Sequence, residues 1–232
     1  MSKIIYLARH AQSESNTGEK ISVNEQIAIT QTGHAQSREL ADWFLAHITN
    51  IEAVFVSNYL RTQQTAKPLI EKLQSLGKLN KNPEILSDLH EFNCLNFANI
   101  KGREFAIVKQ IAEHYWQTAT PDFVDGADLS VPKNWQAESF DEFVNRVKSA
   151  MAYFDALPQG TYVVFTHGIW LSMLHWLILN KTTDSNQAMR DFRQFELANR
   201  PNNCDVFCLK IDDGQFEFSK IRHSNGDNSA MM

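Results

Sequence analysis

The chain has 232 residues, 43% of them hydrophobic and 11% aromatic, which is enough for a full core within a single domain. The formal net charge is -5 at pH 7, and the sequence pI is about 5.9. This balance argues against a broad basic surface for nucleic acid or anionic lipid. Any positive charge that binds an anionic ligand must therefore be local.

Neither a secretion signal nor a membrane anchor is expected. The start, MSKIIYLARH, holds only a short apolar run before Arg9, unlike a signal peptide or a membrane span. The apolar stretch from Ile169 to Leu179 is too short to cross a bilayer and is expected to form a buried helix. Cys204 and Cys208 would lie about 13 Å apart along a strand, too far to form a disulfide. A reducing, cytoplasmic location is predicted.

Strand and helix patterns alternate along the chain. Four apolar runs have the length of strands: residues 3–8, 52–56, 84–86 and 161–165. Three segments carry apolar residues at helical spacing: residues 33–48, 59–76 and 139–157. Ser139 and Glu142 form a possible capping box for the last of these helices. Residues 206–211 and 215–221 flank an Asp-Asp-Gly turn and are expected to form an antiparallel hairpin.

This alternation indicates an α/β fold, here a three-layer α/β/α sandwich with a mainly parallel sheet and an antiparallel edge hairpin. We expect one domain over residues 1–223, with an irregular inserted cap segment at about 92–136 and a disordered tail at 224–232. In such sheets, ligands bind beyond the carboxyl ends of the strands.

A residue able to do chemistry follows each of the four strands expected to be parallel. His10 follows the first strand, Arg61 the second, Glu91 the third and His167 the fourth. The carboxyl ends of parallel strands meet at one edge of a sheet, so these four side chains are predicted to share one rim.

His10 and its predicted neighbours have the properties that phosphoryl transfer needs. A neutral imidazole with one nitrogen held by a hydrogen bond offers the other nitrogen as a nucleophile toward phosphorus. The transition state spreads negative charge over the equatorial oxygens, which the protein must position and neutralise. Arg9 and Arg61 suit this task, because a guanidinium grips two phosphate oxygens and stays protonated. A protonated His167 would add a third cation, and the Asn16 amide a neutral donor.

Three stretches combine these residues: Arg9-His10 after a strand, Ser57-x-x-x-Arg61-x-x-Gln64-Thr65-Ala66, and Thr166-His167-Gly168. Together they resemble the histidine phosphatase superfamily, which includes cofactor-dependent phosphoglycerate mutases. Two further segments extend the resemblance over most of the chain: Ile29-Thr30-x-x-Gly33-x-x-Gln36, and Glu138-Ser139-Phe140 with Arg146.

The resemblance implies a role for each matching residue. His10 would be the phosphorylated nucleophile, and the phosphoryl group would be bound by Arg9, Arg61, His167 and Asn16. Leu89-His90-Glu91 resembles the segment that supplies the acid for the leaving oxygen, which assigns this role to Glu91, with Asp88 as the rival. Ala11 stands where the family's first motif normally has glycine, a change not expected to abolish catalysis.

The predicted function is hydrolysis of a small-molecule phosphomonoester, with no metal, no other cofactor and no nucleic-acid or membrane partner. The alternative is a cofactor-dependent phosphoglycerate mutase that uses the same residues. The phosphatase is preferred because the run after Glu91 departs from the usual family pattern and no long ordered C-terminal extension is evident.

Two other classes of function are less compatible with these residues. A metal-dependent hydrolase with His10, His167 and Glu91 as ligands is disfavoured, because Arg9 and Arg61 would repel a divalent metal. A non-catalytic phosphate-binding protein is the last alternative, since a fold alone does not establish activity. The sequence assigns neither the natural substrate nor the oligomeric state.

Overall fold

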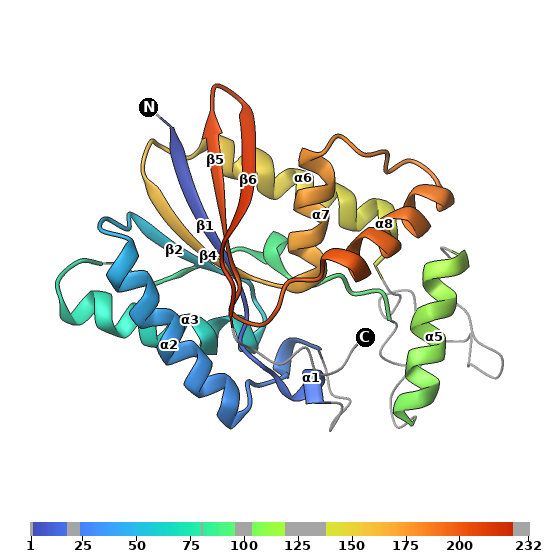
Figure 1. The fold of residues 1–232 in the computed structure, drawn as a ribbon, viewed down its shortest axis with the longest axis horizontal. Helices are drawn as coiled ribbons and strands as arrows, with labels where there is room; N and C mark the ends of the chain where they lie inside the picture. The colour runs from blue at the N-terminus through green and yellow to red at the C-terminus, as the bar shows by residue number, and fades with distance from the viewer. Residues whose placement is uncertain (1, 18–23, 80, 96–103, 119–137, 225–232) are drawn as a thin grey trace.

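The fold is built on one six-stranded sheet, as the computed structural model shows (Figure 1). The structure describes residues 2–17, 24–79, 81–95, 104–118 and 138–224. The strand order is β3-β2-β4-β1-β5-β6. The strands are β1 (Lys3–Arg9), β2 (Ala53–Val56), β3 (Glu84–Ile85), β4 (Thr161–Thr166), β5 (Val206–Asp212) and β6 (Gln215–Arg222).

The first four strands in this order are parallel, β5 pairs antiparallel with β1, and β6 pairs antiparallel with β5. The hairpin between β5 and β6 turns at Asp213 and Gly214, whose φ values of 46° and 74° suit a two-residue turn. Because β5 runs antiparallel, its first residues lie at the edge of the sheet where the parallel strands end. The predicted mainly parallel sheet with an antiparallel edge hairpin is confirmed.

Helices cover both faces of the sheet (Figure 1). The core on one face includes residues of α2 (Gln31–His47) and α3 (Leu60–Ser75). The core on the other face includes residues of α6 (Phe140–Ala156), α7 (Gly168–Ile178) and α8 (Asn186–Asn199). This arrangement confirms the predicted three layers. It also explains why β4 is apolar on successive residues: Tyr162 and Val164 enter one core, and Val163 and Phe165 the other.

Local signals in the sequence explain where the helices begin. The Thr30 side chain caps α2 by accepting a hydrogen bond from the Gly33 backbone nitrogen, and Ser139 and Glu142 form the predicted capping box of α6. A Cβ at Gly33 would lie only 2.2 Å from the Gln12 carbonyl oxygen. Glycine therefore lets the first turn of α2 press against the loop that follows β1.

The prediction of an irregular insertion at 92–136 is wrong for part of that segment. Residues Phe105–Thr118 form the helix α5, whose side chains Tyr115 and Trp116 are buried, and the Trp116 ring packs near Phe192 of α8. Its apolar residues recur at helical spacing, so they lie on one side of the helix and pack towards α8. The sequence-based prediction did not use this pattern. The rest of the expected cap and most of the expected tail, 225–232, lie outside the described residues.

The remaining described helices are short or were not anticipated. They are α1 (Glu14–Thr17) and the 3-10 turns η1 (Asn24–Gln26) and η2 (Ser87–Leu89), together with the already mentioned α8. None of the helices within the described ranges has both the length and the apolar character that spanning a membrane requires. The cytoplasmic location stays a prediction.

Candidate active site

His10 stands at the end of β1 with its imidazole buried. Its backbone nitrogen donates to the Thr166 carbonyl (2.9 Å), which ties it to the end of β4. The ring Nδ1 lies 2.7 Å from the Ala11 carbonyl oxygen, and the Arg61 Nε lies 3.3 Å from the ring Nε2. A carbonyl only accepts and a guanidinium only donates, so both contacts require the tautomer with the proton on Nδ1. Nε2 therefore carries no proton and is the nitrogen that can act as a nucleophile.

The surroundings keep this ring neutral. Burial, followed by the positive charges of Arg61 and Arg9, lowers the pKa of His10 well below its ordinary value. A neutral imidazole is the nucleophilic form, because protonation would occupy the Nε2 lone pair. The sequence-based expectation of a neutral ring with one nitrogen held by a hydrogen bond matches this geometry.

The two arginines reach His10 from different elements. Arg61 lies in the first turn of α3, where its Nη1 donates to the Asn24 carbonyl (2.7 Å). Burial lowers the pKa of Arg61 to about 10, so its guanidinium stays charged at neutral pH. Arg9, at the end of β1, donates through Nη1 to the Pro201 carbonyl. A Cβ at Gly168 would lie 3.2 Å from the Arg9 Nε, so glycine leaves room for this guanidinium.

His167, the N-cap residue of α7, faces His10 with 5.2 Å between the ring centroids. Its Nε2 lies 2.9 Å from the Ser57 hydroxyl. Burial, and then the charge of Arg61, lowers the pKa of His167 well below its ordinary value. The ring is therefore neutral in this structure, in contrast to the third cation considered from the sequence.

Two buried nitrogens of this cluster lack a hydrogen-bond partner among the described residues: Arg9 Nε and His167 Nδ1. A buried polar group without a partner is costly, so such groups in a native protein call for an explanation. Arg9 Nε is a donor, and His167 Nδ1 is a donor in the tautomer whose Nε2 accepts from the Ser57 hydroxyl, so an anion beside them would supply acceptors to both. The unpaired nitrogens thus favour a phosphate-sized anion as the ligand of this cluster.

Asn16 is held with its amide oxygen turned inward. The Asn16 Oδ1 accepts from the Ser13 nitrogen (3.0 Å), the Ser13 hydroxyl (3.1 Å) and the Asn203 Nδ2 (3.2 Å). These contacts leave the Asn16 Nδ2 as a donor with no acceptor in the described part of the chain. The orientation suits the predicted contact to a phosphate oxygen.

The sequence-based search missed Asn203. This buried residue also donates to the His10 carbonyl (2.8 Å), so it links the nucleophile to Asn16. It precedes β5, and the antiparallel direction of β5 brings it to the rim. The predicted hairpin could have indicated Asn203, because the residues before an antiparallel strand lie where the neighbouring parallel strands end.

Glu91 completes the cluster from the segment after β3. Its carboxylate accepts hydrogen bonds from the backbone nitrogens of Phe92 (3.0 Å), Ile169 (3.2 Å) and Trp170 (3.1 Å), at the start of α7. Burial raises the pKa of Glu91, against the opposing effects of the Arg61 charge and of the hydrogen bonds from the Phe92 and Ile169 nitrogens. The carboxyl is thus poised to hold a proton more readily than an exposed glutamate.

Asp88, the rival acid, lies differently. Its backbone carbonyl accepts from the Trp170 Nε1 (2.8 Å), whereas its carboxylate has no hydrogen bond to a described residue. The structure therefore brings Glu91, rather than Asp88, to the start of α7 beside Arg9 and Arg61.

The segments with family resemblance support the loop that follows His10. The Ala11 nitrogen donates to the Thr65 hydroxyl (3.0 Å), and the Gln12 nitrogen donates to the Gln36 amide oxygen (2.8 Å). Ala11 is fully buried, and its methyl group packs in the core beneath α2 and α3. The alanine is thus accommodated where the family normally has glycine.

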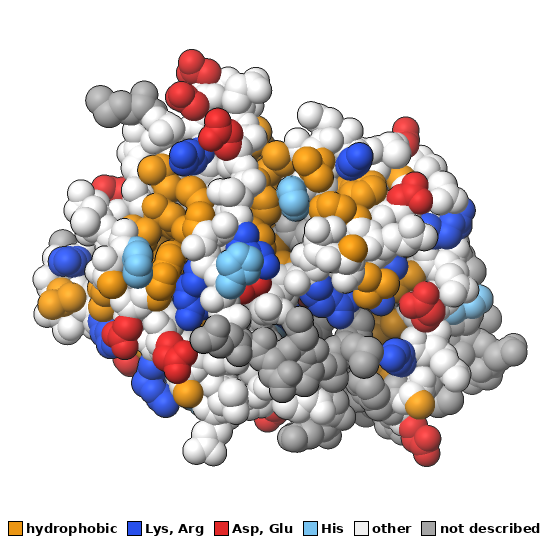
Figure 2. Space-filling model, in the orientation of Figure 1, with side chains coloured by type: hydrophobic (Ala, Val, Ile, Leu, Met, Phe, Trp, Pro, Cys, Tyr) orange, Lys and Arg blue, Asp and Glu red, His pale blue; other side chains and the backbone are white. Residues whose placement is uncertain are grey.

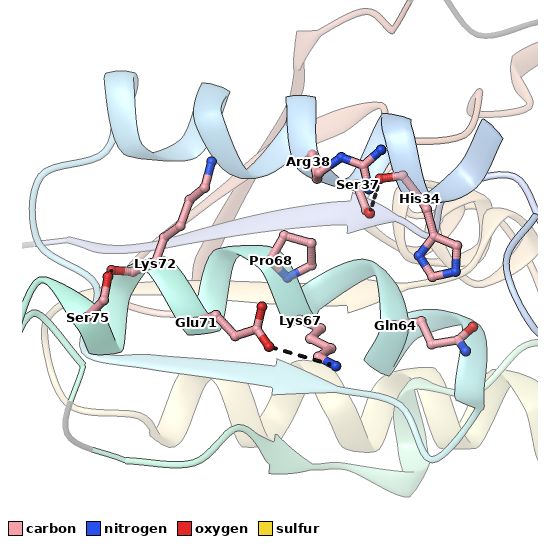
Figure 3. A pocket seen from close by; sticks show the side chains of 9 residues that line it. All are labelled: His34, Ser37, Arg38, Gln64, Lys67, Pro68, Glu71, Lys72 and Ser75. Atoms are coloured by element: carbon pink, nitrogen blue, oxygen red, sulfur yellow. Dashed lines mark hydrogen bonds and ion pairs between the residues drawn. The ribbon is translucent and has the colours of Figure 1, made fainter. Parts of the chain in front are cut away.

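The described part of the chain offers no stronger alternative to this cluster as a functional site. No group of three or more His, Cys, Asp or Glu side chains within the described ranges is arranged to hold a metal ion. On the face in Figure 2, Lys and Arg side chains are scattered among acidic and apolar ones and form no broad basic patch. A surface groove between α2 and α3 is lined by His34, Ser37, Arg38, Gln64, Lys67, Pro68, Glu71, Lys72 and Ser75 (Figure 3). None of the predicted catalytic residues lines this groove.

The chain is similar to known proteins along most of its length. Residues 5–224 match the profile of the histidine phosphatase superfamily (branch 1). The chain belongs to this superfamily. This membership confirms the resemblance first drawn from the Arg9-His10, Ser57 to Ala66 and Thr166 to Gly168 motifs.

Individual relatives in the histidine phosphatase superfamily are distant. A probable phosphoglycerate mutase GpmB from Photorhabdus laumondii is 28% identical over 187 residues, covering 80% of this chain and 79% of the relative. A putative alpha-ribazole-5'-P phosphatase from Escherichia coli has a similar structure, with a TM-score of 0.65, 18% identity and 97% coverage of both chains. A mycobacterial glucosyl-3-phosphoglycerate phosphatase in complex with VO3 has a TM-score of 0.65 and 13% identity, covering 97% of this chain and all of the other. At these identities the two structures show a shared fold.

Replacing Arg61 with glutamine is predicted to raise the pKa of His10, because a nearby positive charge that disfavours the imidazolium is removed. The pKa of His10 should still stay below its ordinary value, since burial lowers it more than the Arg61 charge does. NMR titration of the imidazole nitrogens measures this shift. Arg38→Gln, at an exposed position of α2, is the control and should leave the His10 titration unchanged. An equal or lower pKa in Arg61→Gln would contradict the assigned role of the Arg61 charge.

Proposed function

We propose that this chain is a phosphatase that hydrolyses a small-molecule phosphomonoester through a phosphohistidine on His10. The observation that carries the proposal is the buried, neutral imidazole whose Nε2 faces Arg61 while its Nδ1 is held by the Ala11 carbonyl. Such a ring is a nucleophile with one available end, supported by cationic donors for a phosphoryl group.

In the first step, the Arg61 Nε donates to a phosphoryl oxygen instead of to Nε2 of His10, which frees the Nε2 lone pair. Nε2 then attacks phosphorus, and the bond from phosphorus to the ester oxygen breaks. Glu91 gives its proton to the leaving oxygen, so the product departs as an alcohol. The phosphorylated ring is cationic and keeps its Nδ1 proton, and Nδ1–H donates a hydrogen bond to the Ala11 carbonyl. Arg9, Arg61, His167 and Asn16 donate to the phosphoryl oxygens, which neutralises and orients them.

In the second step, water attacks the phosphorus of the phosphohistidine while Glu91 takes a proton from that water. The phosphorus–nitrogen bond breaks, inorganic phosphate forms, and His10 returns to its neutral state. The raised pKa of Glu91 supports both roles, because the carboxyl must hold a proton in the first step and regain one in the second. Apart from the substrate and water, side chains and one backbone carbonyl of this chain carry out the scheme.

A cofactor-dependent phosphoglycerate mutase is the second candidate. It is favoured by the relative named a probable phosphoglycerate mutase, which matches 80% of this chain. A mutase would use the same His10 chemistry but return the phosphoryl group to a bound organic molecule instead of water. The two activities therefore differ in the acceptor of the second step, not in the nucleophile.

Substrate profiling separates these two functions. We expect the wild type to release free phosphate from small phosphomonoesters, and to do so in the presence of a chelator. With 3-phosphoglycerate, phosphate release should exceed isomerisation. His10→Ala should lower turnover at least about 10³-fold, because the covalent route is lost. Undiminished turnover by His10→Ala would contradict the mechanism, and dominant isomerisation would replace the phosphatase with the mutase.

The role of Glu91 has its own test. In Glu91→Gln, kcat/KM should fall about 10²- to 10⁴-fold for an alkyl phosphate, whose leaving oxygen needs a proton. The loss should be much smaller for 2,4-dinitrophenyl phosphate, because dinitrophenolate departs without protonation. The ratio kcat/KM reports formation of the phosphohistidine and not its hydrolysis. Asp88→Asn is the matched control, and a leaving-group-dependent loss in that variant alone would transfer the role to Asp88.

A further inference from the structure

The residues placed to bind phosphate, here called the phosphate cluster, are Arg9, His10, Asn16, Arg61 and His167. Arg146 lies outside this cluster, yet it contacts the segment that carries Glu91. It projects from α6, and its side chain is only 10% exposed. Its Nη1 donates to the carbonyl oxygens of Asp88 (2.9 Å) and His90 (2.7 Å). One guanidinium nitrogen therefore holds two backbone carbonyls, one of them immediately before Glu91.

The same guanidinium binds Glu138 with two parallel hydrogen bonds, from Nε to Oε1 (2.7 Å) and from Nη2 to Oε2 (2.8 Å). Glu138 in turn pairs with the backbone that follows Glu91. The Asn93 nitrogen donates to the Glu138 Oε2 (3.2 Å), and the Glu138 nitrogen donates to the Asn93 carbonyl (2.9 Å). The ion pair thus grips the chain on both sides of Glu91.

Two further contacts fix this segment against the body of the protein. The Thr166 hydroxyl donates to the Leu89 carbonyl (2.8 Å), beside His167, and the Trp170 Nε1 donates to the Asp88 carbonyl (2.8 Å). From this support the Glu91 carboxylate reaches the start of α7. A shift of the segment would therefore move the carboxyl relative to His10.

We propose that Arg146, together with Glu138, is a positioning residue that holds the Glu91 carboxyl at the leaving-group side of the phosphate cluster. This inference rests on the proposed function. Within the described ranges, Arg146 has no hydrogen bond to Arg9, His10, Arg61 or His167. Its Nη2 lies 3.5 Å from the Glu91 carbonyl oxygen, so its contact with Glu91 is to the backbone, and it acts through the backbone of residues 88–93. It also gives a role to the Glu138 and Arg146 pattern, which the reaction scheme does not use.

Lysine cannot replace the arginine fully in this role. The planar guanidinium supplies several donors in fixed directions, here to one carboxylate and two carbonyls at once. Removal of the arginine would leave the Glu138 carboxylate, whose side chain is 13% exposed, without its cation. The segment would then rearrange to solvate these groups, and Glu91 would move with it.

The experiment compares kcat/KM for an alkyl phosphate with kcat/KM for 2,4-dinitrophenyl phosphate in Arg146→Gln, Arg146→Lys and Glu138→Gln. The ratio of the two values is independent of how much of the sample is folded, since both substrates meet the same enzyme. We expect Arg146→Gln to lower the alkyl phosphate value about 10- to 100-fold more than the dinitrophenyl value. Arg146→Lys should show a smaller change in the same direction.

Arg193→Gln is the matched control. Arg193 is buried to a similar degree, 12% exposed, and pairs with the fully buried Glu196 within α8. Its loss should lower both kcat/KM values by the same factor, because Arg193 pairs with Glu196 and Glu113 and, within the described part of the chain, has no hydrogen bond to residues 88–93.

Equal losses for both substrates in Arg146→Gln would overturn the positioning role and leave Arg146 as a structural residue. Failure of the proposed function gives a different result: the wild type would then lack activity on both substrates, or His10→Ala would retain it. A leaving-group-dependent loss in Arg193→Gln as large as in Arg146→Gln would also overturn the inference, because it would trace the effect to general loosening.

Discussion

The site depends on one constraint: a histidine must stay neutral beside two arginines and present a single nitrogen. Burial and the charges of Arg61 and Arg9 lower the pKa of His10, so the ring carries no proton on Nε2. The Ala11 carbonyl holds the proton on Nδ1. The same arginines that keep the ring neutral are the donors that a phosphoryl group needs. Charge and tautomer therefore favour one direction of attack.

The fold meets this constraint by bringing the ends of separate elements to one rim. His10 and His167 follow the adjacent strands β1 and β4, and Arg61 opens the helix after β2. Asn203 joins them from the start of the antiparallel β5. Glu91 belongs to a segment with little regular structure, so its position depends on side chains, chiefly Arg146, that bind its backbone.

The sequence predicted the layers, the sheet direction and the shared rim, because apolar period and strand order are local or nearly local signals. It could not predict the hydrogen bond of Asn203 to the His10 carbonyl or those of Arg146 to the Asp88 and His90 carbonyls, since these backbone partners are distant in sequence and no residue type encodes them. The sequence left the charge of His167 open, because burial, which lowers its pKa, is a property of the fold. The helix α5 was missed although its apolar spacing was present, because the glycine and proline residues elsewhere in the insertion suggested irregular structure.

The most direct measurement is to trap the covalent intermediate. Wild-type enzyme mixed with a labelled phosphomonoester, stopped in alkali within milliseconds and mapped by peptide mass spectrometry, should carry phosphate on His10. NMR of the labelled peptide should place that phosphate on Nε2, because Nδ1 donates to the Ala11 carbonyl, and brief acid treatment should release it. Phosphate on Nδ1, phosphate on a residue other than His10, or turnover with no trapped phosphoenzyme would contradict the account.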